Sequence, residues 1–256
     1  MKFMRQRVLS GEFLAGGWCN LGSTITVEMV GRAGFDWVLI DLEHGSADYE
    51  TLVHQLQALE STPAAPIVRI AWNEPPRFKR VLDAGASGVM VPYVSTGEEA
   101  KRAAASMRYP PQGIRGVARL NRGSRFGQTF DEYFANANDN LTTIAQIETK
   151  EAVANIEDIA AVDGIDVLFI GPLDLSVNLG VPQQFDDPRF DEALDRVVAA
   201  CRKCGKSAGI LLSAAEQVEK RATQGFTFIA LGSDGGLVAA GARKNAAILG
   251  EYKRSP

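Results

Sequence analysis

The chain has 256 residues, of which 46% are hydrophobic and 23% charged, with 25 glycines and 11 prolines. This balance excludes a disordered, collagenous or coiled-coil protein and is sufficient for one large domain with its own core. The formal net charge is −4 and no basic tract occurs, which excludes the usual electrostatic signature of a nucleic-acid-binding protein.

No run approaches the ~18 apolar residues of a transmembrane helix, and the opening MKFMRQRVLSGEF lacks the apolar segment of a secretory signal. We therefore expect a cytoplasmic protein that acts on small molecules, with no nucleic-acid and no membrane partner.

Short runs rich in Val, Ile, Leu and Phe recur along the chain, separated by helical patterns. In chain order these strand candidates span residues 15–21, 37–44, 66–70, 88–94, 143–148, 167–172, 207–213 and 228–234. Most are almost continuously apolar, as in parallel strands that are buried on both faces. Several of the helical patterns end in glycine just before the next strand, which is the usual C-terminal stop of a helix.

Eight strands that alternate with helices over about 250 residues indicate an α/β protein, a (β/α)8 TIM barrel. The alternative is a doubly wound open sheet, which usually carries a glycine-rich dinucleotide turn after its first strand. The segment GGWCNLGST does not have the G-x-G-x-x-G spacing of that turn. We therefore predict a single barrel domain over residues 1–256, without an internal repeat or linker.

Three cysteines, Cys19, Cys201 and Cys204, are too few for a disulfide framework in a chain of this size and fit a reducing compartment. Cys201 and Cys204 form a C-x-x-C pair, a spacing found in zinc and redox sites. However, the segment DEALDRVVAACRKCGK has the pattern of an amphipathic helix that ends in glycine. A zinc site would need two more ligands, and the only histidines, His44 and His54, lack the spacing. We predict that the pair belongs to a packed helix.

The longest interruption of the pattern covers residues 109–142, between the fourth and fifth strand candidates. A loop beyond ~15 residues in a compact domain is usually functional or mobile. Four arginines lie among the glycines of this segment: Arg115, Arg119, Arg122 and Arg125. The pattern is compatible with the binding of an anionic substrate group and equally with a solvated, partly helical excursion.

Polar residues gather where several strand candidates finish, which is the end of a parallel barrel that carries the functional site. In chain order these residues are Asp41, Glu43, His44, Arg69, Gln146, Glu148 and Asp174. Any one of them has an ordinary explanation as a helix cap or a surface ion pair. Their recurrence at the ends of different strands predicts a site at the barrel mouth.

The residue types at this mouth suit metal-assisted chemistry on a 2-oxo acid. Gln146 and Glu148 are two positions apart on a strand, so their side chains face the same way. A buried carboxylate has to be paired or to coordinate a metal, and Glu148 with Asp174 plus waters would suit Mg²⁺ or Mn²⁺. The planar fork of Arg69 suits a carboxylate or an enolate, and His44 is the obvious neutral-pH base.

The segments FDWVLIDLEHGSAD, PIVRI, RYPPQGIRGVAR, AQIET and FIGPLDLS, taken in this order, resemble the HpcH/HpaI aldolase family. The resemblance runs from about residue 12 to about residue 250 and implies a TIM barrel that is a class II pyruvate aldolase. Such an enzyme reversibly cleaves a 4-hydroxy-2-oxo acid, of the 4-hydroxy-2-oxoheptanedioate or 2-keto-3-deoxy sugar acid type, into pyruvate and an aldehyde. The implied cofactor is a divalent metal: Mg, Mn or Co.

The same resemblance implies roles for individual residues. Glu148 and Asp174 become the metal ligands, His44 the catalytic base and Arg69 the group that stabilises the pyruvate enolate. Asp83 becomes the partner that raises the basicity of the histidine, although it falls at the end of a helix, where a helix normally approaches the opposite barrel face.

Further roles follow around the metal ligands. The implied substrate contacts are Gln146, Gly171, Leu173 and Asp174, and Asp41 and Glu43 are implied to orient metal-bound water. Leu173 stands where relatives often have a smaller residue, so its bulk is expected to narrow or reshape the mouth. The resemblance also implies a homo-oligomer, with a hexamer favoured, in which the last helix, GSDGGLVAAGARKNAAILG, exchanges between subunits.

Three other functions remain open from the sequence. A Schiff-base aldolase would need a desolvated lysine, and only Lys150 lies near the C-terminal end of a strand candidate. A lyase for CoA thioesters, of the citrate lyase β or malyl-CoA lyase type, would need a nucleotide surface, for which residues 109–127 are the one candidate. A non-catalytic metabolite-binding barrel would need no base, so the presence of His44 argues against it.

Overall fold

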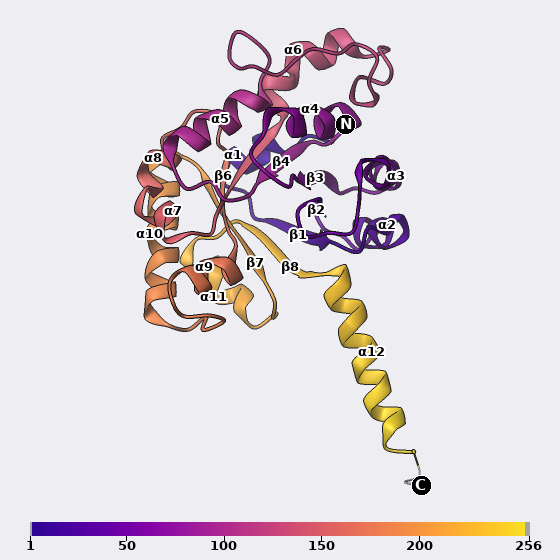
Figure 1. Cartoon of the computed structure of the whole chain (residues 1–256), viewed down its shortest axis with the longest axis vertical. Coiled ribbons are helices and arrows are strands. Elements are labelled where there is room, and N and C mark those ends of the chain that lie inside the picture. Colours follow the sequence, from indigo (N-terminus) through magenta and orange to yellow (C-terminus); the bar gives the residue numbers. More distant parts are fainter. Residues whose placement is uncertain (1, 254–256) are drawn as a thin grey trace.

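The computed structural model describes residues 2–253, which form a closed parallel barrel surrounded by helices (Figure 1). The strands are β1 (Leu14–Cys19), β2 (Trp37–Asp41), β3 (Ala65–Arg69), β4 (Gly88–Val91), β5 (Thr142–Ile147), β6 (Val167–Ile170), β7 (Ser207–Leu212) and β8 (Phe228–Ser233). Each pairs in parallel with the next, and β8 closes the barrel against β1. All eight predicted strands are present, and the closed barrel confirms the predicted architecture over the open sheet.

Most of the helices lie around the outside of the barrel, and the last one extends away from it (Figure 1). They are α1 (Arg5–Leu9), α2 (Thr24–Arg32), α3 (Tyr49–Glu60), α4 (Pro75–Ala84), α5 (Gly97–Met107), α6 (Phe130–Asn140), α7 (Lys150–Ala154), α8 (Ile156–Ala160), α9 (Pro172–Asn178), α10 (Pro188–Cys204), α11 (Gln217–Gln224) and α12 (Asp234–Gly250), with a 3₁₀ turn, η1, at Arg122–Ser124. None of the helices in the described residues is long and apolar enough to cross a membrane.

Two apolar cores hold this arrangement together. The larger one lies between the strands and the surrounding helices. The smaller one fills the barrel interior, where Trp37 stacks on Phe228 with ring centroids 4.1 Å apart and Phe169 packs edge-on against both. Gly16 leaves the room for Trp37, because a Cβ at this position would lie only 2.1 Å from the Trp37 ring. Met4, just before α1, belongs to the interior core.

Every strand ends one to three residues earlier than the sequence pattern predicts, and the difference is largest in β2 and β4. β2 ends at Asp41, not at His44, because the Asp41 carboxylate accepts hydrogen bonds from the backbone N–H groups of Glu43 and His44 and bends the chain out of the sheet. β4 ends at Val91, and Tyr93 follows with a φ of 51°, in the left-handed region. Both differences place side chains on loops at the mouth of the barrel.

The prediction for the cysteine pair is confirmed. Both residues lie in the last turn and a half of α10, which ends at Gly205 with a φ of 64°. Cys201 is buried, and all three cysteines are free thiols. Burial raises the pKa of the Cys201 thiol to about 12, so this thiol is held in its neutral form within the helical core.

The long segment between β4 and β5 is partly helical, as one of its two interpretations predicts. It contains η1 and α6, and Arg115 is buried within it. The Arg115 guanidinium lies over the rings of Tyr109 and Tyr133 and donates hydrogen bonds to the Tyr133 hydroxyl and, at 2.8 Å, to Asp83. Arg122 pairs with Glu60, at 2.7 Å. These two arginines are therefore engaged in fixing the segment to the outside of the barrel.

The last helix, α12, extends away from the barrel (Figure 1). Its start is fixed because the buried Asp234 carboxylate accepts hydrogen bonds from the backbone N–H of Asn20 and the hydroxyl of Thr26. Farther along, large apolar side chains are exposed, among them Leu237, Val238, Ile248 and Leu249. Exchange of this helix between subunits stays a prediction.

Candidate active site

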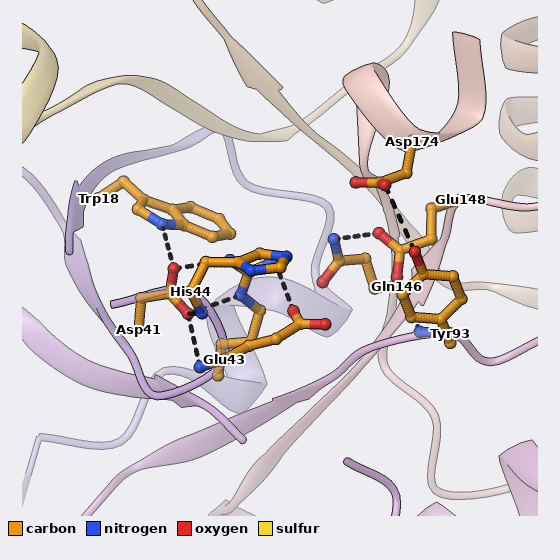
Figure 2. Close-up of polar contacts among 9 residues, drawn as sticks. Trp18, Asp41, Glu43, His44, Tyr93, Gln146, Glu148 and Asp174 are labelled. Carbon is orange, nitrogen blue, oxygen red and sulfur yellow. Dashed lines mark hydrogen bonds and ion pairs between the residues drawn. The ribbon is translucent and has the colours of Figure 1, made fainter. Parts of the chain in front are cut away.

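The polar residues predicted from the strand ends come together at one end of the barrel, in two clusters (Figure 2). The first cluster is built around Asp41, the last residue of β2, and Arg69, the last residue of β3, which are direct neighbours in the sheet register. The second is built around Glu148, which follows β5, and Asp174, on the first turn of α9 after β6. The barrel closure explains why residues more than 100 positions apart share this mouth.

In the first cluster, Arg69 is 7% exposed and grips Asp41 with two hydrogen bonds. Nε donates to Oδ1 at 2.9 Å and Nη2 donates to Oδ2 at 2.6 Å. The remaining nitrogen, Nη1, lies 2.8 Å from Oε2 of Glu43. The Arg69 guanidinium also lies over the Trp18 ring, 4.8 Å from its centroid, and the indole N–H of Trp18 donates to Asp41 Oδ2 at 3.3 Å.

These contacts decide the charge states of the cluster. Burial acts to raise the pKa of Asp41, but the hydrogen bonds and the charge of Arg69, with two backbone N–H groups, outweigh it, so the pKa is lowered and the carboxylate stays ionised. Burial likewise acts to lower the pKa of Arg69, and the two carboxylates leave it raised. For Glu43 burial dominates and raises the pKa.

His44 lies on the exposed loop after β2, and its backbone N–H donates to Asp41 Oδ1 at 3.3 Å. Figure 2 shows its imidazole beside Glu43. The backbone of His44 is thus held by Asp41, and its side chain is exposed to solvent. His54, the other histidine, lies exposed on α3, away from the strand ends.

In the second cluster, Glu148 is 1% exposed and each of its oxygens accepts one hydrogen bond. The backbone N–H of Tyr93 donates to Oε1 at 2.8 Å, and the side-chain amide of Gln146 donates to Oε2 at 2.5 Å. The Tyr93 hydroxyl lies 3.4 Å from Oδ1 of Asp174 (Figure 2). Gln146 and Glu148 thus face the same way, as their spacing predicts.

The pKa of Glu148 is raised to about 7, mainly by burial and also by the nearby carboxylates of Glu43 and Asp174, against the lowering effects of the Tyr93 N–H and Arg69. Three acidic groups therefore face one space, and Arg69 is the cation that partly offsets them.

The second cluster fits a divalent cation on two observations. Oε1 of Gln146 is buried and has no hydrogen-bond partner in the described residues. The oxygens of Glu148 and Asp174 are hard ligands of the kind that Mg²⁺ and Mn²⁺ prefer. Within residues 2–253 no group of three or more His, Cys, Asp or Glu side chains is arranged to hold a metal. A cation here would therefore depend on these two carboxylates together with water or substrate oxygens.

Gly171 stands where the backbone passes closest to these carboxylates. A Cβ at this position would lie 2.4 Å from Oε2 of Glu148 and 2.8 Å from Nε2 of Gln146, so no larger residue fits without displacing them. Two residues later, Leu173 is 53% exposed on the first turn of α9. The contact of this side chain with a substrate, and its narrowing of the mouth, stay predictions.

Asp83 lies elsewhere. It is near the C-terminal end of α4, just before β4 begins, which is the opposite end of the barrel from the strand C-termini. Its carboxylate accepts a hydrogen bond from the buried Arg115. The structure therefore does not bring Asp83 to His44 within the described chain, because α4 runs back along the outside of the barrel. A role of Asp83 beside the histidine stays a prediction.

Sequence reasoning missed two aromatic residues of the site, Trp18 and Tyr93. Both lie in apolar segments that read as strand core, so nothing in their neighbours marks them as polar contacts. Trp18 holds Asp41 through its indole N–H, and Tyr93 contacts both Glu148 and Asp174. The one available signal for Tyr93 is the preceding Pro92, which is unfavourable in the middle of a buried strand.

Comparison with known proteins supplies a family for this arrangement. The family model described as HpcH/HpaI aldolase/citrate lyase matches residues 14–240. The chain is 42% identical over 229 residues to a 5-keto-4-deoxy-D-glucarate aldolase of Klebsiella pneumoniae subsp. pneumoniae, covering 90% of this chain and 89% of that protein.

Solved structures agree. An HpcH/HpaI aldolase/citrate lyase family protein from Burkholderia cenocepacia J2315 superposes with a TM-score of 0.91 at 34% identity, covering 96% of this chain and 98% of that one. An HpcH/HpaI aldolase from Desulfitobacterium hafniense DCB-2 superposes with a TM-score of 0.88 at 28% identity, covering 100% and 98%.

Proposed function

The chain belongs to the HpcH/HpaI aldolase/citrate lyase family, and we propose that it is a divalent-metal-dependent aldolase that reversibly cleaves a 4-hydroxy-2-oxo acid into pyruvate and an aldehyde. The observation that carries the proposal is the mouth itself: the buried carboxylate of Glu148 and the half-buried carboxylate of Asp174 face the same space as Arg69 and His44. The proposed substrate is a 2-keto-3-deoxy sugar acid, since a relative that is 42% identical to this chain is named a 5-keto-4-deoxy-D-glucarate aldolase.

Glu148 and Asp174 would hold the cation, with the Gln146 amide beside them. When bound, Mg²⁺, Mn²⁺ or Co²⁺ would draw electrons from the 2-oxo group and so lower the cost of the charge that forms as the bond breaks. The Gly171 backbone would let the substrate lie against the carboxylates, and Leu173 would limit the space for the aldehyde part. Asp41 and Glu43 would orient water near the cation, in addition to their contacts with Arg69.

The chain's own residues account for the proton and the charge. His44 would take the proton of the 4-hydroxyl group as the C3–C4 bond breaks, which releases the aldehyde and leaves the electron pair on the pyruvate enolate. Arg69 donates two of its five N–H groups to Asp41 and pairs with Glu43 through Nη1, so further N–H groups remain to stabilise the enolate oxygen. His44 would then return the proton to C3, which yields pyruvate.

The alternative chemistries have less support. Lys150 is exposed at the start of α7, so it does not lie in the desolvated pocket that a Schiff-base lysine needs. A CoA-thioester lyase would need residues 109–127 for the nucleotide, and Arg115 and Arg122 in this segment are already paired. A non-catalytic metabolite-binding barrel would need no base, so the exposed His44 at the mouth argues against it.

The exposed apolar side chains of α12 support a homo-oligomer, and we propose the hexamer that the family resemblance favours. The three free cysteines fit the reducing cytoplasm that we propose as its location.

The test of the function uses pyruvate in D₂O, because the enolate forms without any aldehyde. We expect deuteration of the pyruvate methyl group, followed by NMR, to require Mn²⁺, to stop with EDTA and to fall by about 10²- to 10⁴-fold in His44→Ala. His54→Ala is the matched control, since it removes the other histidine far from the mouth. Exchange that resists EDTA, or that persists unchanged in His44→Ala, would contradict the proposal.

A further inference from the structure

Tyr93 contacts both carboxylates of the second cluster from a single position. Its backbone N–H donates to Oε1 of Glu148 at 2.8 Å, and its hydroxyl lies 3.4 Å from Oδ1 of Asp174. The two carboxylates come from different strand ends, β5 and β6, and Tyr93 comes from a third, the end of β4. Figure 2 shows the ring beside Glu148 with its hydroxyl directed at Asp174.

The backbone at Tyr93 is held in a conformation that residues other than glycine rarely adopt, with a φ of 51°. Two hydrogen bonds hold it there. The Tyr93 N–H bonds to Glu148, and the next N–H, of Val94, bonds to the backbone carbonyl of Gln146 at 3.2 Å. Two successive N–H groups therefore point toward the end of β5, and an unfavourable conformation kept in this way is typical of a functional site.

The side chain is also restrained. The Tyr93 ring packs against the Trp72 ring, with centroids 5.9 Å apart and planes at 35°, and Trp72 is itself 51% exposed at the mouth. This contact limits the rotation of the tyrosine ring and so fixes the direction of the hydroxyl. In the described part of the chain no other side chain donates a hydrogen bond to Asp174.

We propose that Tyr93 is a positioning residue that sets the affinity of the site for a divalent cation, by holding Glu148 through its N–H and Asp174 through its hydroxyl. The inference rests on the proposed metal site and adds a residue that orients its ligands. With Oδ1 of Asp174 held by the tyrosine, Oδ2 is left to face a cation. Hydrogen bonds that orient ligating carboxylates commonly contribute strongly to metal affinity.

The test measures Mn²⁺ binding to the full chain by electron paramagnetic resonance of the free ion, which needs no turnover. Tyr93→Phe removes the hydroxyl and keeps the ring against Trp72. We expect its dissociation constant for Mn²⁺ to be about threefold to tenfold larger than that of the wild type. This is less than the loss of affinity usual when a hydrogen-bond partner of a metal ligand is removed, because this hydrogen bond is long at 3.4 Å. Tyr49→Phe is the matched control, because Tyr49 lies on α3 with its ring under the Arg80 guanidinium, and we expect its affinity for Mn²⁺ to be unchanged.

Two further measurements separate positioning from damage and from failure of the metal site. Excess Mn²⁺ should restore the turnover of Tyr93→Phe to within about twofold of the wild type, which a misfolded site would not allow. Glu148→Gln should abolish the Mn²⁺ site altogether. If Glu148→Gln does so while Tyr93→Phe binds Mn²⁺ like the wild type, the role of Tyr93 is refuted and the metal site stands. If the wild type binds no Mn²⁺ that depends on Glu148, the metal site fails and the role of Tyr93 fails with it.

Discussion

Arg69 and Asp41 form a two-pronged ion pair across neighbouring strands, with Nε–Oδ1 and Nη2–Oδ2 distances of 2.9 and 2.6 Å. Both side chains are buried at the mouth of the barrel. The pair fixes the guanidinium in the position proposed for enolate stabilisation, and Asp41 also bends the loop that carries His44. The Asp41 carboxylate is therefore expected to matter both for the stability of the fold and for the proposed activity.

Asp41→Asn is expected to lower the free energy of unfolding by about 2 kcal/mol, because a buried guanidinium loses a charged partner while Glu43 still offsets part of the loss. Urea unfolding measures the change. The matched control is Glu50→Gln, an exposed carboxylate in the first turn of α3, for which we expect less than about 0.5 kcal/mol. Equal stability of Asp41→Asn and the wild type would show that the pair adds no net stability.

The same pair predicts a pH dependence. The pKa of Asp41 is lowered in the folded protein, so its contribution to stability is complete above the ordinary aspartate pKa near 4 and is lost as the pH falls through the lower, folded value. The difference in unfolding free energy between the wild type and Asp41→Asn should therefore shrink below about pH 4. Unfolding measured from pH 7 down to pH 3 checks this, and a difference that grows with acid would contradict the lowered pKa.

Gly171→Ala is expected to weaken Mn²⁺ binding by about tenfold to a hundredfold. The added methyl group would lie 2.4 Å from Oε2 of Glu148, so the carboxylate has to move away from its bond with Gln146. Calorimetric titration with Mn²⁺ measures the effect. Gly97→Ala is the control, because a Cβ there meets Asp158 at an ordinary contact distance of 3.4 Å. Unchanged binding in Gly171→Ala would remove Glu148 from the proposed ligands.

The exposed apolar side chains of α12 predict a role in assembly. A double variant, Leu237→Asp with Leu249→Asp, is expected to shift the protein to a smaller assembly, because charged groups are costly in an apolar interface. Sedimentation velocity measures the mass in solution. Arg243→Asp, which changes the charge of the same helix without touching its large apolar side chains, should leave the assembly intact. A wild type that sediments as a monomer would contradict the proposed oligomer.

The fold could be predicted because barrel strands are buried on both faces and so leave continuous apolar runs, such as residues 37–40 and 66–68, between glycine-ended helices. The polar residues at the mouth could be predicted for the same reason, since they interrupt those runs. The contacts among them could not. In the sequence, Asp41 and Arg69 are the ends of two separate strands, and only the register of the sheet shows that they are neighbours. Asp83 was expected beside the histidine, but α4 places it at the other end of the barrel.

Tyr93 marks a different limit. Its position depends on a left-handed backbone that turns two N–H groups toward a neighbouring strand, and nothing in the segment GVMVPYV except the proline announces it. A pattern of apolar residues predicts where a strand runs, whereas the geometry at its last residue is set by partners from distant parts of the chain.

The aromatic layer inside the barrel has a consequence for the chemistry above it. Trp18 touches both levels, since its indole N–H reaches Asp41 and its ring lies 6.0 Å from that of Phe169, which pairs in the register with Gln146. Side chains packed this closely compress very little. Glu148, Glu43 and Asp174 therefore cannot lower their mutual repulsion by sinking into the barrel. A proton or a cation that enters from the mouth of the barrel would lower this repulsion. The rigid interior therefore favours the binding of positive charge at the mouth.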